Sequence, residues 1–214
     1  MAETALQGAR DMIAAPRDPE ANSDEAGRVA MEGRIALVRN LIKFEKWDQI
    51  MTAGVIVWND QNDFAKSERL FVETLALNGL GKVQDAKERL QDFKALEAKT
   101  AADPKAPKDE FSFNSLLLNV CEGIVALSEG RVLEGRKALL DAAAIDAKFL
   151  GGDPPFTAWR VIRLLGDDYR KRGEVRSAIE CYERALKEEP NDGFTLSGLA
   201  LAHHAAGDND RAAY

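Results

Sequence analysis

Apolar residues recur along most of the chain at intervals of three and four positions, as in Val120, Ile124 and Leu127. This spacing places the apolar side chains on one face of an α-helix. No segment sustains the alternation of apolar and polar residues that a half-buried strand requires. The pattern therefore predicts an all-α fold.

The C-terminal third of the chain contains an internal repeat with a period of 34 residues. Its matching pairs are Ile162 and Leu196, Leu165 and Leu199, Gly166 and Ala200, Tyr169 and His203, Gly173 and Gly207, and Ala178 and Ala212. Gly166 and Ala178 are small enough for two helices to cross closely. Gly173 suits the positive φ that ends a helix, and Pro190 stops the second helix. Each copy is therefore predicted to be a pair of antiparallel helices.

The turn between the two helices has counterparts earlier in the chain. The aligned segments are residues 81–86, 130–135 and 173–178, with residues 45–50 as a weaker fourth match. Polar linkers over residues 99–108 and 150–156 account for the two longest spacings between these turns. We therefore predict about five antiparallel helical hairpins. A short helix near residues 3–14 and a disordered segment over residues 15–27 are expected to precede them.

The first copy of the repeat, residues 159–192, resembles a tetratricopeptide repeat. The residues that fit the family pattern are the large Ile162, Leu165, Tyr169 and Tyr182, the small Gly166, Ala178 and Ala185, and Pro190. The resemblance implies that the hairpins stack as a right-handed α-solenoid, the tetratricopeptide superhelix. The second copy begins at Gly193 and stops at position 22 of 34. We interpret this incomplete copy as a sign that the chain is a fragment or a truncated product.

The whole sequence is also similar to the C-terminal part of longer bacterial tetratricopeptide proteins, most of which have no assigned activity. The residues that carry this similarity are the hairpin over residues 64–98, Glu129-Gly130-Arg131 and the linker over residues 153–156. The predicted division of the chain is a short helix with a flexible acidic segment (1–27), divergent hairpins (28–110), a divergent hairpin with a Pro/Gly linker (111–158), a well-matched repeat (159–192) and an incomplete repeat (193–214).

The composition is typical of a soluble globular protein, with 45% apolar and 30% charged residues among 214. The net charge is −7, much of it in the acidic segment before residue 28, so nucleic-acid binding is not expected. No apolar run is long enough to insert into a membrane, and no secretory signal precedes the helices. We expect a cytoplasmic protein if the chain is complete. If it is a fragment, the missing signal carries no information, and a periplasmic or secreted location stays open. Cys121 and Cys181 are predicted to be small buried thiols inside helices rather than a disulfide.

Motifs for catalysis, cofactor binding and metal binding are missing from the sequence. Ser197-Gly198 lies on a predicted helix, and the adjacent His203 and His204 point about 100° apart on a helix, so they cannot share a metal ion. Residues 78–81 lack the preceding strand and the third glycine that a phosphate-binding loop needs, so we interpret them as the end of a helix. Residues 59–63 are predicted to form a polar turn that caps a helix beginning near Phe64. We therefore predict no catalytic, cofactor-binding or metal-binding residues and no enzymatic activity.

The family resemblance implies that the first helix of each repeat lines a concave groove. The groove positions carried onto this chain are Arg160, Arg163, Asp167, Arg170, Lys171, Phe194, Ser197, Leu201 and His204. Several bases beside two apolar side chains suit an extended peptide with an acidic or C-terminal carboxylate group and one apolar anchor. A solvated face held by internal salt bridges is the alternative interpretation. Leu117, Val120, Ile124 and Leu127 either line the same groove or are buried beneath the linkers.

Three functions follow from this organisation. The first is a noncatalytic scaffold that binds a protein or peptide in its groove. The second is a structural or regulatory segment of a larger tetratricopeptide protein, which docks on another domain or self-associates through apolar solenoid ends. The third, an enzyme, would need a site shared with another chain and has no motif in its favour.

Overall fold

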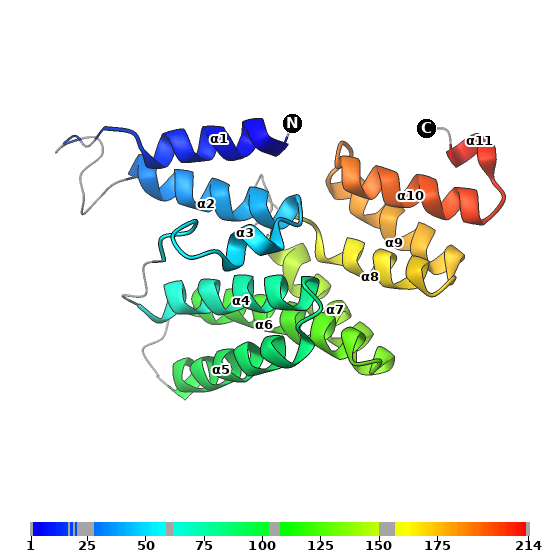
Figure 1. The fold of residues 1–214 in the computed structure, drawn as a ribbon. Helices are drawn as coiled ribbons and strands as arrows, with labels where there is room; N and C mark the ends of the chain where they lie inside the picture. Colours follow the sequence, from blue (N-terminus) through cyan, green and yellow to red (C-terminus); the bar gives the residue numbers. More distant parts are fainter. Residues whose placement is uncertain are drawn as a thin grey trace. The chain divides into compact units, whose positions relative to one another are not determined.

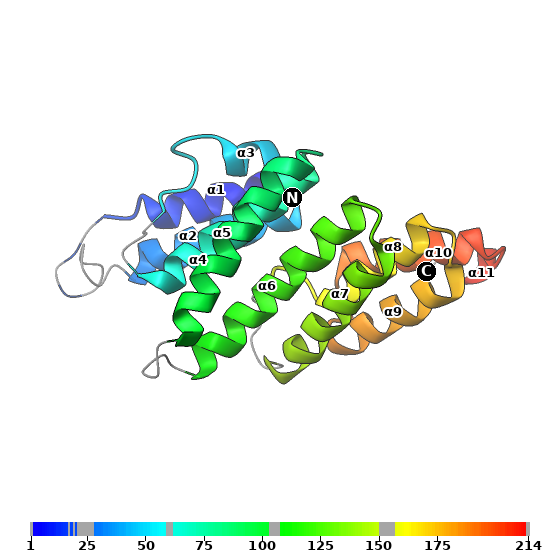
Figure 2. The same cartoon turned by 90° about the horizontal axis from the view of Figure 1, so that it is seen from below.

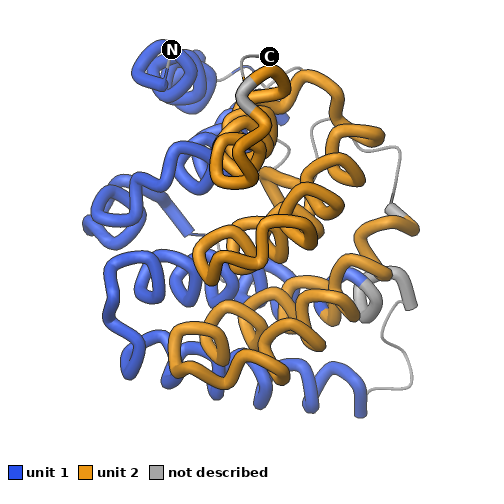
Figure 3. The backbone as a smooth tube through the Cα atoms, turned by 90° about the vertical axis from the view of Figure 1, so that its right-hand side faces the viewer, with its two compact units in different colours: residues 1–114 blue, residues 115–214 orange. Residues whose placement is uncertain are grey.

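The computed structural model describes residues 2–16, 18, 20, 28–58, 62–102, 108–149 and 157–212. Every element from α1 to α11 is a helix, and successive helices pack as antiparallel pairs (Figure 1). The predicted all-α fold with the character of a tetratricopeptide-like helical repeat is confirmed. The described part of the chain forms two compact units, residues 1–114 and 115–214 (Figure 3).

The first unit contains two long antiparallel helix pairs. Its helices are α1 (Ala2–Ile13), α2 (Arg28–Lys43), α3 (Trp47–Met51), α4 (Asp63–Gly79), α5 (Val83–Ala102) and the first part of α6 (Lys108–Ser128). Helix α1 packs on α2, and α4 packs on α5. Leu6, Leu37, Leu41 and Phe93 are fully buried and form the apolar core. The predicted short helix near residues 3–14 corresponds to α1, whereas most of the predicted disordered segment lies outside the described residues.

The hairpin predicted around residues 45–50, the weaker match to the turn pattern, differs from expectation. Glu45 does end α2 with a positive φ of 52°, and Lys46 N–H donates to the Leu41 carbonyl at 2.8 Å. The helix that follows, α3, has only five residues, because the chain turns away through Gly54, whose φ is +82°. Helix α2 therefore finds its long antiparallel partner in α1. Helix α3 packs instead on the end of α4.

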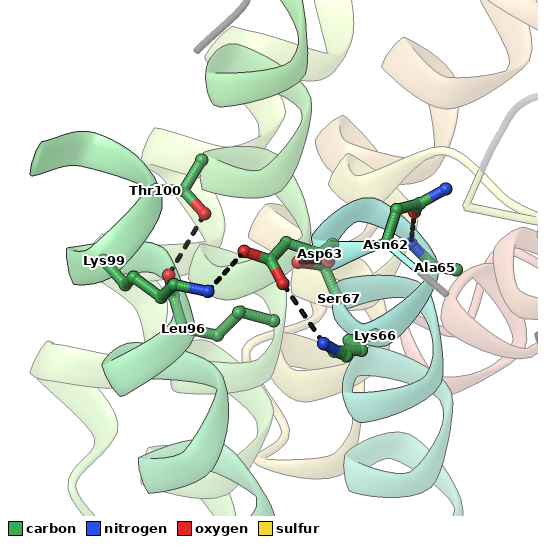
Figure 4. A network of polar contacts seen from close by, with 8 residues as sticks. All are labelled: Asn62, Asp63, Ala65, Lys66, Ser67, Leu96, Lys99 and Thr100. Atoms are coloured by element: carbon green, nitrogen blue, oxygen red, sulfur yellow. Dashed lines mark hydrogen bonds and ion pairs between the residues drawn. The ribbon is translucent and has the colours of Figure 1, made fainter. Parts of the chain in front are cut away.

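The predicted polar cap of α4 is confirmed in its described part, and residues 59–61 lie outside it. The Asn62 side chain accepts a hydrogen bond from Ala65 N–H at 2.8 Å. Asp63 bonds to Lys99 of α5 at 2.9 Å and to Lys66 at 3.3 Å (Figure 4). These bonds lower the pKa of the Asp63 carboxyl. The start of α4 is thereby tied to the end of α5.

The second unit contains the rest of α6, then α7 (Val132–Asp146), the short 3-10 helix η1 (Ala147–Phe149), α8 (Val161–Lys171), α9 (Val175–Glu188), α10 (Gly193–Ala205) and α11 (Asn209–Ala212) (Figure 2). The predicted hairpin glycines Gly130, Gly173 and Gly207 have φ values of +80°, +77° and +79°. Of the apolar stripe on α6, Leu117 and Val120 are buried while Ile124 and Leu127 are partly buried. The stripe therefore belongs to the core.

Candidate functional site

Helices α8, α9 and α10 meet around the side chain of Tyr182. This ring is fully buried. A Cβ added at Gly166 of α8 would lie 2.8 Å from the ring, and one added at Gly198 of α10 would lie 2.7 Å from it. The ring is thus held between two glycines, one from the preceding helix and one from the following helix. The prediction that Gly166 allows a close approach is confirmed.

The Tyr182 hydroxyl orders two of the predicted site residues. It donates a hydrogen bond to Asp167 Oδ1 at 2.7 Å and accepts one from Arg170 Nε at 3.3 Å. Burial and the neighbouring Asp167 carboxylate raise the pKa of Tyr182, so the hydroxyl stays protonated. Asp167 and Arg170 are therefore fixed to the core of the unit rather than free to rearrange around a ligand.

Arg163 links α8 to α10. Its guanidinium lies 5.7 Å from the centre of the Phe194 ring, and its Nε lies 3.7 Å from Asp167 Oδ2. The Arg163 residue is buried, while Phe194 is 39% exposed. The aromatic ring thus covers the cation and offers its own outer surface to solvent.

The outer surface of α10 exposes the other predicted residues. Asp192 caps this helix by accepting a hydrogen bond from Thr195 N–H at 3.0 Å. Ser197 and His204 are exposed, and Leu201 is 51% exposed. We use the name α8–α10 face for the predicted groove residues of these two helices that are at least partly exposed, which are Asp167, Arg170, Lys171, Phe194, Ser197, Leu201 and His204.

The three helices around Tyr182 include one segment that resembles a known family. Residues 159–192 match the tetratricopeptide repeat family. The matched repeat comprises α8, α9 and the turns on either side of them. No curated protein and no solved structure matches the chain.

Arg160, predicted to line the groove, lies instead in a buried cluster of charges at the start of the matched repeat. Its guanidinium lies 3.6 Å from Asp146 of α7, 3.5 Å from Glu188 and 3.2 Å from Glu189. Asp146 also accepts a hydrogen bond from Val161 N–H at 3.2 Å, which caps α8. Burial raises the pKa of the Asp146 carboxyl. With 8% of its surface exposed, Arg160 offers little to a ligand.

Arg136 joins α7 to the matched repeat, a role that sequence reasoning missed. Its guanidinium bonds to Asp168 Oδ2 at 2.7 Å and to Glu174 Oε1 at 2.6 Å. Its Cζ lies 4.0 Å from the centre of the Tyr169 ring. The bonds to Glu174 and Asp168 raise the pKa of Arg136. The sequence did contain an indication of this role. When Gly130 is aligned with Gly173, Arg136 takes the position of the apolar Ile179 in the well-matched repeat.

The described residues offer no obvious chemistry beyond these contacts. Within the described ranges, no three side chains of His, Cys, Asp or Glu are grouped so that they could hold a metal ion. His203 is buried, and neither Cys121 nor Cys181 is in a disulfide. Cys121 is buried as predicted, whereas Cys181 is only partly buried, which differs from the prediction. Among the described helices, none is long and apolar enough to cross a lipid bilayer.

Proposed function

We propose that the chain is a noncatalytic protein-interaction scaffold that binds a peptide or protein segment on the α8–α10 face. A tetratricopeptide repeat implies protein partners in general, and one such repeat lies at residues 159–192. The observation that carries the proposal is the exposure of Phe194 and Leu201 on α10. Arg163 of α8 lies 5.7 Å from the Phe194 ring, and Lys171 is exposed at the end of α8. Apolar side chains on a pre-ordered surface bind a partner with little ordering cost.

The proposed ligand is an extended segment with an acidic or C-terminal carboxylate group and one apolar side chain. Lys171 is exposed and supplies a cation at the end of α8. Leu201 supplies an apolar contact on α10. A ligand carboxylate near Lys171 and a ligand aliphatic group over Leu201 would satisfy both features at once.

The test is fluorescence anisotropy with labelled acidic peptides of about ten residues that contain one leucine and a free C-terminal carboxylate. Reversal of Lys171 to Glu and removal of the apolar contact by Leu201→Ser should each weaken binding about fivefold or more. Arg184→Glu is the matched control, because it reverses an exposed charge on α9 outside this face. Equal loss of binding in the control and the Lys171 variant would refute the proposal. Peptides that fail to bind the unaltered chain would refute it as well.

Arg163 is unsuitable for charge reversal in this test. A glutamate at that buried position would face Asp167, whose Oδ2 lies 3.7 Å from Arg163 Nε. A buried glutamate that faces the Asp167 carboxylate, with no arginine between them, would destabilise the hairpin itself. A loss of binding in such a variant would report misfolding as readily as a lost contact.

A second candidate function is a docking or oligomerisation segment within a larger tetratricopeptide protein. Leu196 and Leu201, which are 39% and 51% exposed on α10, favour it, since both would be covered in a stacked assembly. Measuring the self-association of Leu196→Ser by sedimentation equilibrium distinguishes the two functions. Loss of self-association with peptide binding intact would support the second candidate.

A further inference from the structure

Helix α7 carries exposed leucines where the equivalent helices carry polar residues. Leu133 is 84% exposed and Leu140 is 49% exposed. Counted from the glycine of each hairpin turn, the residues at the position of Leu133 are Gln84 in α5 and Arg176 in α9. Those at the position of Leu140 are Gln91 and Glu183. All four of these polar residues are exposed. The repeat architecture therefore does not require leucine at either place.

The exposed residues of α7 form a seam of the kind found in coiled coils. Leu133, Lys137, Leu140 and Ala144 are all exposed and are separated by four, three and four positions. This spacing aligns them along one side of the helix. The opposite side is the buried one, with Gly135, Leu139 and Ala142. The seam thus faces away from the core of the second unit.

We propose that this seam binds α7 of a second copy of the chain in an antiparallel pair. In an antiparallel pair, each seam residue faces the residue that lies equally far from the opposite end of the seam on the other helix. Leu133 then faces the small Ala144 of the second copy, and Leu140 faces the aliphatic stem of Lys137 of the second copy. Each large side chain meets a small or flexible one, so the seam is complementary to itself.

The charges along the seam favour this orientation. Lys137 is 2.7 Å from Asp141 within its own helix, and an antiparallel copy brings a second Asp141 close to the same ammonium group. Glu134 lies near the start of the seam, where it and Glu129 both pair with Arg131, and the exposed Lys148 lies beyond its end. The net negative charge of that cluster therefore comes near Lys148 of the other copy at both ends of an antiparallel pair. A parallel pair would place Lys137 beside Lys137 and Glu134 beside Glu134, which is repulsive.

The contact area is small, because α7 has 15 residues. We therefore expect a weak dimer that forms at protein concentrations of roughly 0.1 to 1 mM. The surface lies on a different helix from the α8–α10 face, so the inference does not depend on the proposed function. Dimer formation and peptide binding should occur independently.

The first test is sedimentation equilibrium of the full chain across that concentration range. The double variant Leu133→Gln, Leu140→Gln gives α7 the residues that α5 carries at these places. It should weaken the dimer by about tenfold or more while the far-UV circular dichroism spectrum stays unchanged. Val57→Gln, which removes an apolar side chain that is 74% exposed outside α7, is the matched control and should dimerise like the unaltered chain. A chain that stays monomeric throughout, or a dimer weakened only by the Val57 variant, would overturn the proposal.

The second test reads the orientation by disulfide formation between chains. A mixture of Leu133→Cys and Ala144→Cys chains should cross-link under mild oxidation, beyond the background from the native thiols of the unaltered chain. Either variant alone should stay at background, because two copies of the same position lie about 16 Å apart along an antiparallel pair. Cross-linking of each variant alone, at the rate of the mixture, would contradict the antiparallel register.

Discussion

A single methyl group at Gly198 should loosen the packing of α10 on α9. The Cβ of Gly198→Ala would lie 2.7 Å from Tyr182 Cζ and 3.0 Å from its hydroxyl oxygen. On the α8 side the ring also lies close to the backbone, since a Cβ added at Gly166 would be 2.8 Å from it. The substitution therefore overpacks a ring that is held closely from two sides.

Two terms of opposite sign set the magnitude. Overpacking of a buried site costs about 1–3 kcal/mol. Alanine in a helix interior is favoured over glycine by about 1 kcal/mol. The free energy of unfolding should therefore fall by about 0–2 kcal/mol, with the centre of that range close to 1 kcal/mol. Gly193→Ala is the control on the same helix, because nothing lies within 4 Å of a Cβ at Gly193. That variant should be neutral or slightly stabilising.

Hydrogen exchange of the α10 amides is the appropriate assay, because helical repeats need not unfold in one step. Exchange in residues 193–205 should be about fivefold faster in Gly198→Ala than in Gly193→Ala, as expected for about 1 kcal/mol. Exchange that is slower in Gly198→Ala than in Gly193→Ala would refute the close packing of Tyr182 between the glycines.

Three further predictions concern single residues. Burial raises the pKa of the Cys181 thiol to about 11 from 9.0, so its alkylation near pH 8 should be about a hundredfold slower than that of a thiol with the ordinary pKa. Because burial also raises the pKa of Asp146, the folded chain binds that proton more readily than the unfolded chain. The unaltered chain should thus gain stability relative to Asp146→Asn as thermal unfolding is measured at falling pH. Asn62→Ala removes the cap of α4 and should cost about 1 kcal/mol in urea unfolding.

The hairpin turns were predictable because each depends on a local requirement. Gly130 and Gly173 need positive φ. Asn62 caps α4 by accepting a hydrogen bond from the N–H of Ala65, three residues later. Such features depend on residues adjacent in sequence, so the one-dimensional pattern contains them. The length of α3 was not predictable in this way. It depends on Gly54 turning the chain and on the packing of Trp47 against Gly79 of α4.

The candidate site was only partly predictable for a related reason. Its positions follow from the resemblance of residues 159–192 to a tetratricopeptide repeat, and Ser197, Leu201 and His204 are exposed as a surface requires. The resemblance does not reveal which charged side chains the neighbouring elements cover. Arg160 meets acids from the preceding helix and from the end of α9, and Arg163 lies beneath Phe194. These partners come from elements distant in sequence, so burial of the two arginines emerges only in three dimensions.

The burial of those arginines changes what a ligand would encounter. The sequence counts four cations on or beside α8, but Arg160 and Arg163 are covered and lie near carboxylates. Lys171, at the end of α8, is the exposed cation of that set, and Leu201 is exposed on α10. An exposed ion pair contributes about 0–1 kcal/mol, whereas burying a leucine side chain contributes about 1.5–3 kcal/mol. Apolar contact with α10 would therefore supply most of the affinity on the α8–α10 face, and the cation would set the direction in which the bound segment runs.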